Sequence, residues 1–193
     1  MGRIIDLNLW KSLDEIQNRK LISQKMLLAS LYLTSYEILK SSIIEQVHDY
    51  YQIGYQQGRG KEYNPLYETE VRSKVKDGKD ILIASALWLV SMEALTEEDV
   101  ESIRDVRQHR NEIAHELHEI LFYSNRSVRI ELIKTIRNLV YKADSWWIRN
   151  VEIPFHNSIA DKPIPENEIN DVFSGPVIIL DLIIDHAFKT ISG

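Results

Sequence analysis

Cysteine is absent from the chain of 193 residues. This absence excludes disulfide bonds, thiolate metal sites and a cysteine nucleophile, so any chemistry has to come from histidine, carboxylate, arginine or hydroxyl groups. Long apolar runs are absent as well. The strongest run, residues 81–90, is too short to cross a bilayer core of about 30 Å, and no basic segment followed by a long apolar core opens the chain. We therefore expect a soluble, cytoplasmic protein with no membrane partner.

Positive charge is scarce relative to negative charge. The chain has 23 Lys and Arg residues against 29 Asp and Glu residues, which gives a formal net charge of −6. Non-specific nucleic-acid binding depends mainly on phosphate neutralisation, so any RNA contact must be local. Two local basic groups are present: Arg104, Arg107 and Arg110, and then Arg126, Arg129, Lys134, Arg137, Lys142 and Arg149. The second group fits either an RNA contact or a solvated helix face.

Apolar residues make up 44% of the chain, which is enough to bury one core. We predict a single domain over residues 1–193, with a core over about residues 12–150 and a C-terminal extension and helix over 151–193. Helical periodicity predicts an all-α, antiparallel bundle of four to five helices. The predicted helices span residues 12–51, as one helix or two joined near Asn18, then 79–95, 97–122, 124 or 127 to 150, and 175–191.

Residues that cap or break helices set these boundaries. Thr96 and Asp99 have the spacing of a capping box at the start of the third helix. Glycines and Pro65 interrupt the periodicity over residues 52–78, and we find no period-2 alternation long enough for a sheet. Three prolines predict an extended connection over residues 151–167 before the last helix: Pro154, Pro163 and Pro165.

The third predicted helix carries polar side chains beside its apolar stripe. At 100° per residue, the stripe consists of Ile103, Val106, Ile113, Ala114, Leu117, Ile120 and Leu121. Arg110 lies near the middle of this stripe. Asn111 and His115, one turn apart, share a flank with Arg104, Arg107 and His118. The arrangement indicates a functional site, an interface, or both.

Arg110 needs a carboxylate partner if it is buried, because a lone desolvated charge is costly. Glu37 lies on the face of the first helix that we expect to pack inward. The pair fits either a site in which Glu37 orients Arg110 or a structural buried ion pair. His115 is either a proton-transfer group or an exposed histidine bonded to a carboxylate such as Glu119. Asn111 is either a phosphate ligand or a plain surface residue.

Arg110, Asn111 and His115 resemble the signature of the HEPN superfamily, R-x4-6-H with a polar residue directly after the arginine, on a late helix of an all-α bundle. The resemblance covers roughly the first 150 residues. Many members of that superfamily are metal-independent ribonucleases of toxin–antitoxin, abortive-infection and other defence systems, and their active site forms where two copies dimerise. Others have lost catalysis. One subtype, paired with nucleotidyltransferase antitoxins, has a tyrosine two residues after the histidine, whereas this chain has Leu117.

The resemblance implies a homodimer that cleaves RNA by attack of the ribose 2′-OH on its own 3′-phosphate, without a cofactor or metal. An antitoxin protein is a further expected partner. Such chemistry needs a group near pKa 6.5 and a fixed cation, which an imidazole and a guanidinium supply. The residues assigned to this site are Arg110, His115 and Asn111 as catalytic groups, with Glu37, Arg107, Arg104 and His118 in support. The alternative is a non-catalytic HEPN-like module that dimerises or binds a nucleotide or a protein.

Two E-x-x-H segments allow a different hypothesis, since ferritin-like di-iron bundles use this spacing. The segments run from Glu45 to His48 and from Glu112 to His115. Such sites need every ligand to point into the core, whereas Glu112 lies about 160° from the apolar centre of its own helix. The further glutamate ligands are not evident either. We therefore expect no metal site.

Overall fold

The computed structural model describes residues 17–58, 60–122, 126–159, 162, 164–165 and 172–192. Within these residues the chain forms six α-helices and one two-stranded hairpin. The helices are α2 (Arg19–Tyr51), α3 (Ile81–Ser91), α4 (Glu97–Phe122), α5 (Glu131–Trp147), α6 (Ile153–Ile159) and α8 (Gly175–Ser192). The prediction of an all-α bundle is confirmed. None of the described helices is both long enough and apolar enough to span a membrane.

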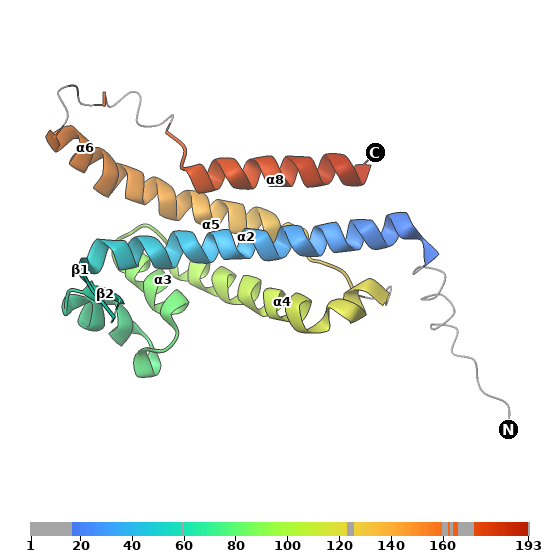
Figure 1. The fold of residues 1–193 in the computed structure, drawn as a ribbon, viewed down its shortest axis with the longest axis horizontal. Helices are drawn as coiled ribbons and strands as arrows, with labels where there is room; N and C mark the ends of the chain where they lie inside the picture. Colours follow the sequence, from blue (N-terminus) through green and yellow to red (C-terminus); the bar gives the residue numbers. More distant parts are fainter. Residues whose placement is uncertain are drawn as a thin grey trace.

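With 33 residues, α2 is the longest of the described helices and lies at the centre of the bundle (Figure 1). It contacts α3, α4, α5 and α8. In Figure 1, α4 runs antiparallel to α2 on one side, and α5 and α8 lie on the other. The helix begins after Asn18, whose side chain accepts a hydrogen bond from the backbone N–H of Leu21 over 3.1 Å. The start of α2 coincides with the position at which a joint was expected, and residues 12–16 of the predicted helix lie outside the described residues.

One apolar core fills the space between these helices. Its fully buried side chains include Tyr32 and Leu39 of α2, Ile103 and Ile113 of α4, Ile136 of α5 and Leu180 of α8. The adjacent residues Trp146 and Trp147 differ in burial, because neighbouring residues of a helix point in different directions. Trp147 is buried and Trp146 is partly exposed. Both rings pack against Trp88 of α3. The core therefore connects α2, α3, α4, α5 and α8 in one cluster.

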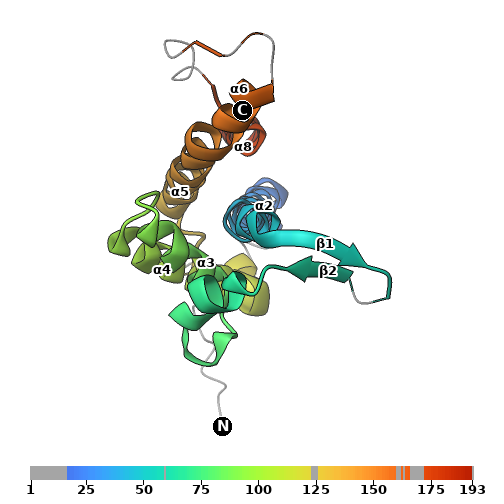
Figure 2. The ribbon, with the colours of Figure 1, turned by 90° about the vertical axis from the view of Figure 1, so that its left-hand side faces the viewer.

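The segment after α2 differs from the prediction, because it contains a hairpin. Strand β1 (Gln52–Gln56) pairs antiparallel with β2 (Gly60–Tyr63), and Figure 2 shows the hairpin extending away from the helices. Both strands are short and mostly exposed, so the alternation of Ile53 and Tyr55 with other residues in β1 is too short to indicate a sheet. Gly58 has a φ of +83° in the turn, a conformation that favours glycine. Short π and 3-10 turns follow: Tyr67–Val71, Arg72–Lys74 and Lys76–Gly78.

The segment after α5 also differs from the prediction of an extended chain. A π-helical turn (Ile148–Glu152) continues α5, and α6 follows directly. Pro154 is the second residue of α6 and follows the π-helical turn directly, so this proline does not end the helix. Pro163 lies outside the described residues. Ser124, one of the two predicted starts of the helix that ends near residue 150, lies outside them as well. The start of α8 at Gly175 agrees with the prediction.

Candidate functional site

Helix α4 carries the predicted motif and begins as predicted. The Thr96 hydroxyl accepts a hydrogen bond from the backbone N–H of Asp99 over 3.2 Å, and the Asp99 carboxylate accepts one from the N–H of Thr96 over 2.9 Å. This capping box stabilises the first turn. The helix bends at Glu116, whose φ of −118° and ψ of 25° are not helical. The bend follows His115 directly, so the motif lies in the straight part of α4.

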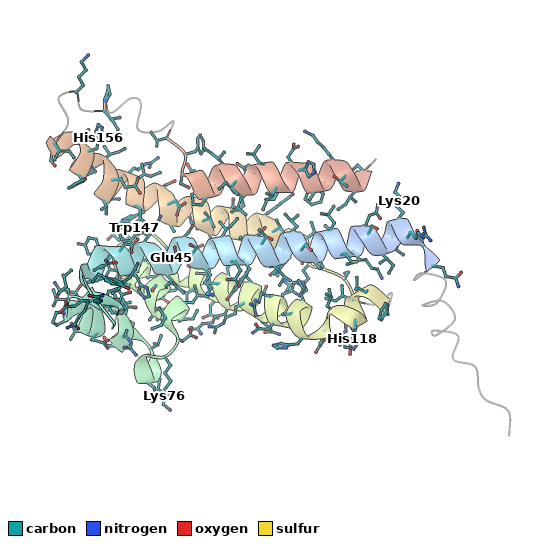
Figure 3. The ribbon with its side chains drawn as sticks, in the orientation of Figure 1. Lys20, Glu45, Lys76, His118, Trp147 and His156 are labelled. Atoms are coloured by element: carbon teal, nitrogen blue, oxygen red, sulfur yellow. The ribbon has the colours of Figure 1, made fainter. Side chains whose placement is uncertain are left out.

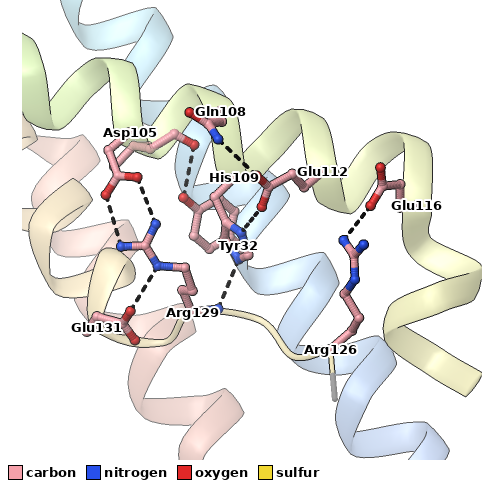
Figure 4. Close-up of polar contacts among 10 residues, drawn as sticks. Tyr32, Asp105, Gln108, His109, Glu112, Glu116, Arg126, Arg129 and Glu131 are labelled. Atoms are coloured by element: carbon pink, nitrogen blue, oxygen red, sulfur yellow. Dashed lines mark hydrogen bonds and ion pairs between the residues drawn. The ribbon is translucent and has the colours of Figure 1, made fainter. Parts of the chain in front are cut away.

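A histidine that was not among the predicted site residues, His109, lies in the buried face of α4. It is 4% exposed, and its ring packs edge-on against Tyr32 of α2 with the centroids 5.0 Å apart. Its Nε2 accepts a hydrogen bond from the backbone N–H of Arg129 over 2.9 Å (Figure 4). The ring proton is therefore on Nδ1, which donates to Glu112 over 2.9 Å. With both ring nitrogens bonded, His109 has a structural role.

Glu112 connects this buried histidine to the surface. Its carboxylate accepts the hydrogen bond from His109 and a second one from Gln108 over 3.2 Å. These hydrogen bonds lower the pKa of Glu112. Although Glu112 lies away from the centre of the apolar stripe, as expected, it is tied to the core through His109.

Arg110 lies at the edge of the buried face and not at its middle. Its side chain is 33% exposed, and that of Glu37 is 50% exposed. Arg110 Nη2 donates to Glu37 Oε1 over 3.3 Å, and Nη1 donates to Asn111 Oδ1 over 3.3 Å. The guanidinium also lies 5.5 Å from the centre of the Tyr36 ring. The contact between Glu37 and Arg110 is present, but the expectation that it is buried is wrong, because His109 occupies the core-facing position instead.

The outward face of α4 contains a shallow hollow of about 520 Å³, the α4 hollow. Its lining residues all belong to α4: Arg104, Arg107, Gln108, Asn111, Glu112, His115 and Glu116. Four of the predicted site residues therefore lie together here. Arg110, Glu37 and His118 do not line the hollow. His118 is exposed beyond the bend, near the end of α4 (Figure 3), and Ala114, predicted in the apolar stripe, is exposed as well.

His115 is the imidazole of the α4 hollow. The ring is exposed, and none of the described residues forms a hydrogen bond with it. The expected alternative partner, Glu119, instead pairs with Arg126 over 3.2 Å. His115 is therefore available to exchange a proton with a bound molecule.

The two arginines of the α4 hollow are held by carboxylates. Arg107 Nη1 donates to both oxygens of Asp80, each over 2.8 Å, and Arg104 donates to Glu101 over 3.2 Å. Asp80 also accepts a hydrogen bond from the backbone N–H of Ile83 over 3.3 Å, so it caps α3 and holds Arg107 at the same time. These partly exposed pairs are weak, at about 0 to 1 kcal/mol each, and an anion can compete for the guanidinium groups.

Most of the basic residues in the second group, which spans residues 126–149, form ion pairs that link different parts of the fold. Arg126 pairs with Glu116 and Glu119, Arg129 with Asp105 and Glu131, Arg137 with Asp181, and Lys142 with Asp99. Figure 4 shows Arg126 with Glu116, and Arg129 with Asp105 and Glu131, beside α4. For these four residues the structure favours the interpretation as a solvated, ion-paired face over an RNA contact.

The E-x-x-H segments do not assemble a di-iron site. In the first segment, His48 Nε2 is hydrogen-bonded with the Tyr67 hydroxyl over 2.7 Å. In the second, Glu112 is bonded to His109 and not to His115. Among the described residues, no group of three or more histidine, aspartate and glutamate side chains is placed to hold a metal ion.

Comparison of the chain with family models, with curated proteins and with solved structures gives no match. Functional inference therefore depends on the chemistry of the α4 hollow. The hollow combines an exposed imidazole, guanidinium groups and amides on one helix face. These groups can transfer a proton, stabilise negative charge and orient an oxyanion.

Proposed function

We propose that the chain is an HEPN-like endoribonuclease that needs no metal ion and acts at the α4 hollow. The proposal is carried by one observation, that His115, with a free imidazole, shares a hollow with Asn111, Arg104 and Arg107. An imidazole exchanges protons near neutral pH, and a guanidinium stabilises the charge of a phosphorane. Both are required when RNA is cleaved without a metal ion.

Each side chain has a role that its neighbours support. Asn111 binds a phosphate oxygen through its Nδ2–H groups, because its Oδ1 already accepts a hydrogen bond from Arg110. Arg110 is held in turn by Glu37, so it positions Asn111 and adds positive charge close to the phosphate. Arg107 offers the part of its guanidinium that Asp80 does not occupy.

The proposed reaction is an internal transesterification. The ribose 2′-oxygen forms a bond to the adjacent phosphorus, and the bond from phosphorus to the 5′-oxygen breaks. One imidazole accepts the 2′-OH proton, and a second imidazole donates a proton to the leaving 5′-oxygen. The products are a 2′,3′-cyclic phosphate and a 5′-OH end.

A second copy of the chain would supply the second imidazole. All residues that line the hollow come from α4, so one chain forms only one wall. A two-fold axis beside α4 would face two copies of His115 across one cleft, because an isologous interface uses the same patch twice. It would also bring together the Arg104 and Arg107 side chains of both copies.

The test is incubation of the purified protein with single-stranded RNA in excess EDTA. We expect cleavage that leaves 2′,3′-cyclic phosphate ends, and no cleavage of a 2′-O-methyl RNA of the same sequence, because it lacks the attacking hydroxyl. Loss of activity in EDTA with recovery on addition of iron, manganese or zinc would contradict the proposal.

A second candidate is a non-catalytic HEPN-like module that dimerises or binds a nucleotide or a protein, such as an antitoxin. It is favoured by the carboxylates around the α4 hollow, where Glu112 and Glu116 line the wall and Asp80 holds Arg107. Such a module would form the α4 dimer but leave RNA intact. The first candidate, the endoribonuclease, would act as the toxin of a defence system.

A further inference from the structure

Glu112 is the carboxylate of the α4 hollow whose position is fixed from inside the bundle. Its Oε2 accepts a hydrogen bond over 2.9 Å from Nδ1 of His109, a residue that is 4% exposed. Its Oε1 accepts one over 3.2 Å from Gln108 Nε2 (Figure 4). The ring of His109 is itself fixed, because the backbone N–H of Arg129 donates to its Nε2. Two separate donors therefore hold the two oxygens of Glu112 in place.

Glu112 keeps its negative charge although two donors hold it. Gln108 is an amide, and His109 has only one ring proton because its Nε2 is an acceptor, so both donors are neutral. The other carboxylate in the lining of the hollow, Glu116, is instead paired with the guanidinium of Arg126 over 2.6 Å. Of these two carboxylates, Glu112 is the one whose charge is left for a bound molecule.

The carboxylate of Glu112 can accept further hydrogen bonds. Its side chain is 41% exposed and lines the hollow. A carboxylate has about four acceptor sites, two at each oxygen, and the bonds from His109 and Gln108 use one site at each oxygen. What remains is a pair of fixed acceptors side by side. This pattern fits two neighbouring donors on one rigid group.

Guanine is the RNA base that matches two adjacent acceptors. Its Watson–Crick edge presents N1–H and one N2–H side by side. Adenine and cytosine present an amino donor beside a ring acceptor, and uracil presents N3–H between two carbonyl acceptors. Sequence-specific proteins read single-stranded RNA largely through such edges. Hydrogen bonds to an ionised carboxylate are also stronger than those between neutral groups.

We propose that Glu112 selects guanine as the base on the 5′ side of the cleaved bond. This inference rests on the proposed function and names its substrate, single-stranded RNA that contains guanosine. Glu112 follows Asn111 directly and lies one turn before His115, a spacing at which side chains on a helix are about 5 to 6 Å apart. A guanosine nucleotide then binds with its base at Glu112 and its 3′-phosphate at Asn111. Arg104 and Arg107 in the same lining offset the repulsion between carboxylate and phosphate.

The experiment is a calorimetric titration of the full chain with nucleoside 3′-monophosphates, which report base recognition without a cleavage step. We expect guanosine 3′-monophosphate to bind about tenfold more tightly than adenosine 3′-monophosphate, as for one bidentate contact to a base. Inosine 3′-monophosphate lacks the N2 amino group and should bind several-fold more weakly than the guanosine compound. Because this comparison uses the wild-type protein, it does not depend on the stability of a variant.

Glu112→Gln tests the residue itself. The amide oxygen can still accept the hydrogen bond from His109, but the amide nitrogen replaces the second acceptor with a donor. We expect this variant to bind the guanosine and adenosine compounds within about twofold of each other, the scatter of surface changes. Glu97→Gln removes the same charge from an exposed position in the first turn of α4 and should keep the wild-type preference. Unfolding curves verify that both variants are folded.

Cleavage of a single-stranded RNA that contains all four bases separates this proposal from the proposed function. We expect the wild type to leave 2′,3′-cyclic phosphate ends on guanosine, and Glu112→Gln to cleave after all four bases. Preferential binding of guanosine 3′-monophosphate without any RNA cleavage would support guanine recognition by Glu112 and contradict the endoribonuclease. Cleavage by the wild type without preference for a base, equal binding of the guanosine and adenosine compounds, or no saturable binding of the guanosine compound would overturn the role of Glu112.

Discussion

His109, buried in the core, donates a hydrogen bond over 2.9 Å to Glu112, which lines the α4 hollow. The other ring nitrogen of His109 accepts from the backbone of Arg129, just before α5. One side chain thus joins α4, the chain segment before α5 and the wall of the candidate site. The position of Glu112 is set by the packing of the bundle, and not by the surface helix face alone.

The two histidines of α4 should differ in their effect on stability. His109→Ala removes a buried ring and leaves the Arg129 N–H without its acceptor, so we expect a loss of about 3 kcal/mol in the free energy of unfolding. His115→Ala changes an exposed side chain, so its free energy of unfolding should stay within about 0.5 kcal/mol of that of the wild type. Urea denaturation measures both. A similar stability for the two variants would show that His109 is not a core residue.

Asp80→Asn should strengthen binding of single-stranded RNA. Asparagine still caps α3, but it no longer neutralises Arg107. We expect a several-fold higher affinity for a 2′-O-methyl oligonucleotide and a salt dependence steeper by about 0.7 in log–log slope, the value for one additional phosphate contact. Asp181→Asn is the control, because it removes a carboxylate that pairs with Arg137. An equal increase in both variants would indicate a general charge effect and not release of Arg107.

Asp105→Asn should reduce stability at neutral pH more than in acid. Hydrogen bonds from Arg129 lower the pKa of Asp105 in the folded state. The contribution of this pair is therefore complete above the unfolded pKa of about 3.9 and is lost as the pH falls through the lower folded value. For a half-exposed pair we expect a loss of about 0.2 to 1 kcal/mol at pH 7. Urea titrations at pH 7 and pH 3 check this, and a larger difference at pH 3 would contradict it.

A dimer through the α4 hollow should be visible by cross-linking. The chain has no cysteine, so Ala114→Cys places a single thiol on the exposed face beside His115. We expect a short thiol-reactive cross-linker to produce a covalent dimer of this variant. Thr190→Cys, on an exposed position of α8, should remain monomeric under the same conditions. Cross-linking of Thr190→Cys but not of Ala114→Cys would place the dimer interface elsewhere.

The long helices could be predicted from the sequence because their signals are local. Thr96 and Asp99 cap the start of α4, and the Ser174 hydroxyl caps the start of α8 by accepting a hydrogen bond from the N–H of Val177. The hairpin after Tyr51 could not be predicted in this way, because both of its faces are mostly exposed. The helical turns over residues 148–159 differ from the prediction because proline usually ends a helix, whereas Pro154 lies within turns that continue α5.

The candidate site, like the fold, could be predicted from the sequence only where local signals determine it. Arg104, Arg107, Asn111 and His115 were predicted to share a face, and the structure brings them together because helix periodicity alone sets that relationship. The burial of Arg110 was predicted incorrectly. Only tertiary packing shows that His109 faces Tyr32 and that Arg110 lies at the edge of the interface with α2. A signal was present, since His109 lies three residues after Val106 and four before Ile113, both of which are buried.

RNA cleavage by His115→Ala in EDTA tests the central claim most directly. His186→Ala, an exposed histidine of α8, provides the matched control, and unfolding curves verify that both variants are folded. Because His115 is assigned to proton transfer in the chemical step, we expect its loss to reduce the cleavage rate by about 100-fold or more, with His186→Ala equal to wild type. Cleavage by folded His115→Ala at the wild-type rate would contradict the assignment of the α4 hollow as the active site.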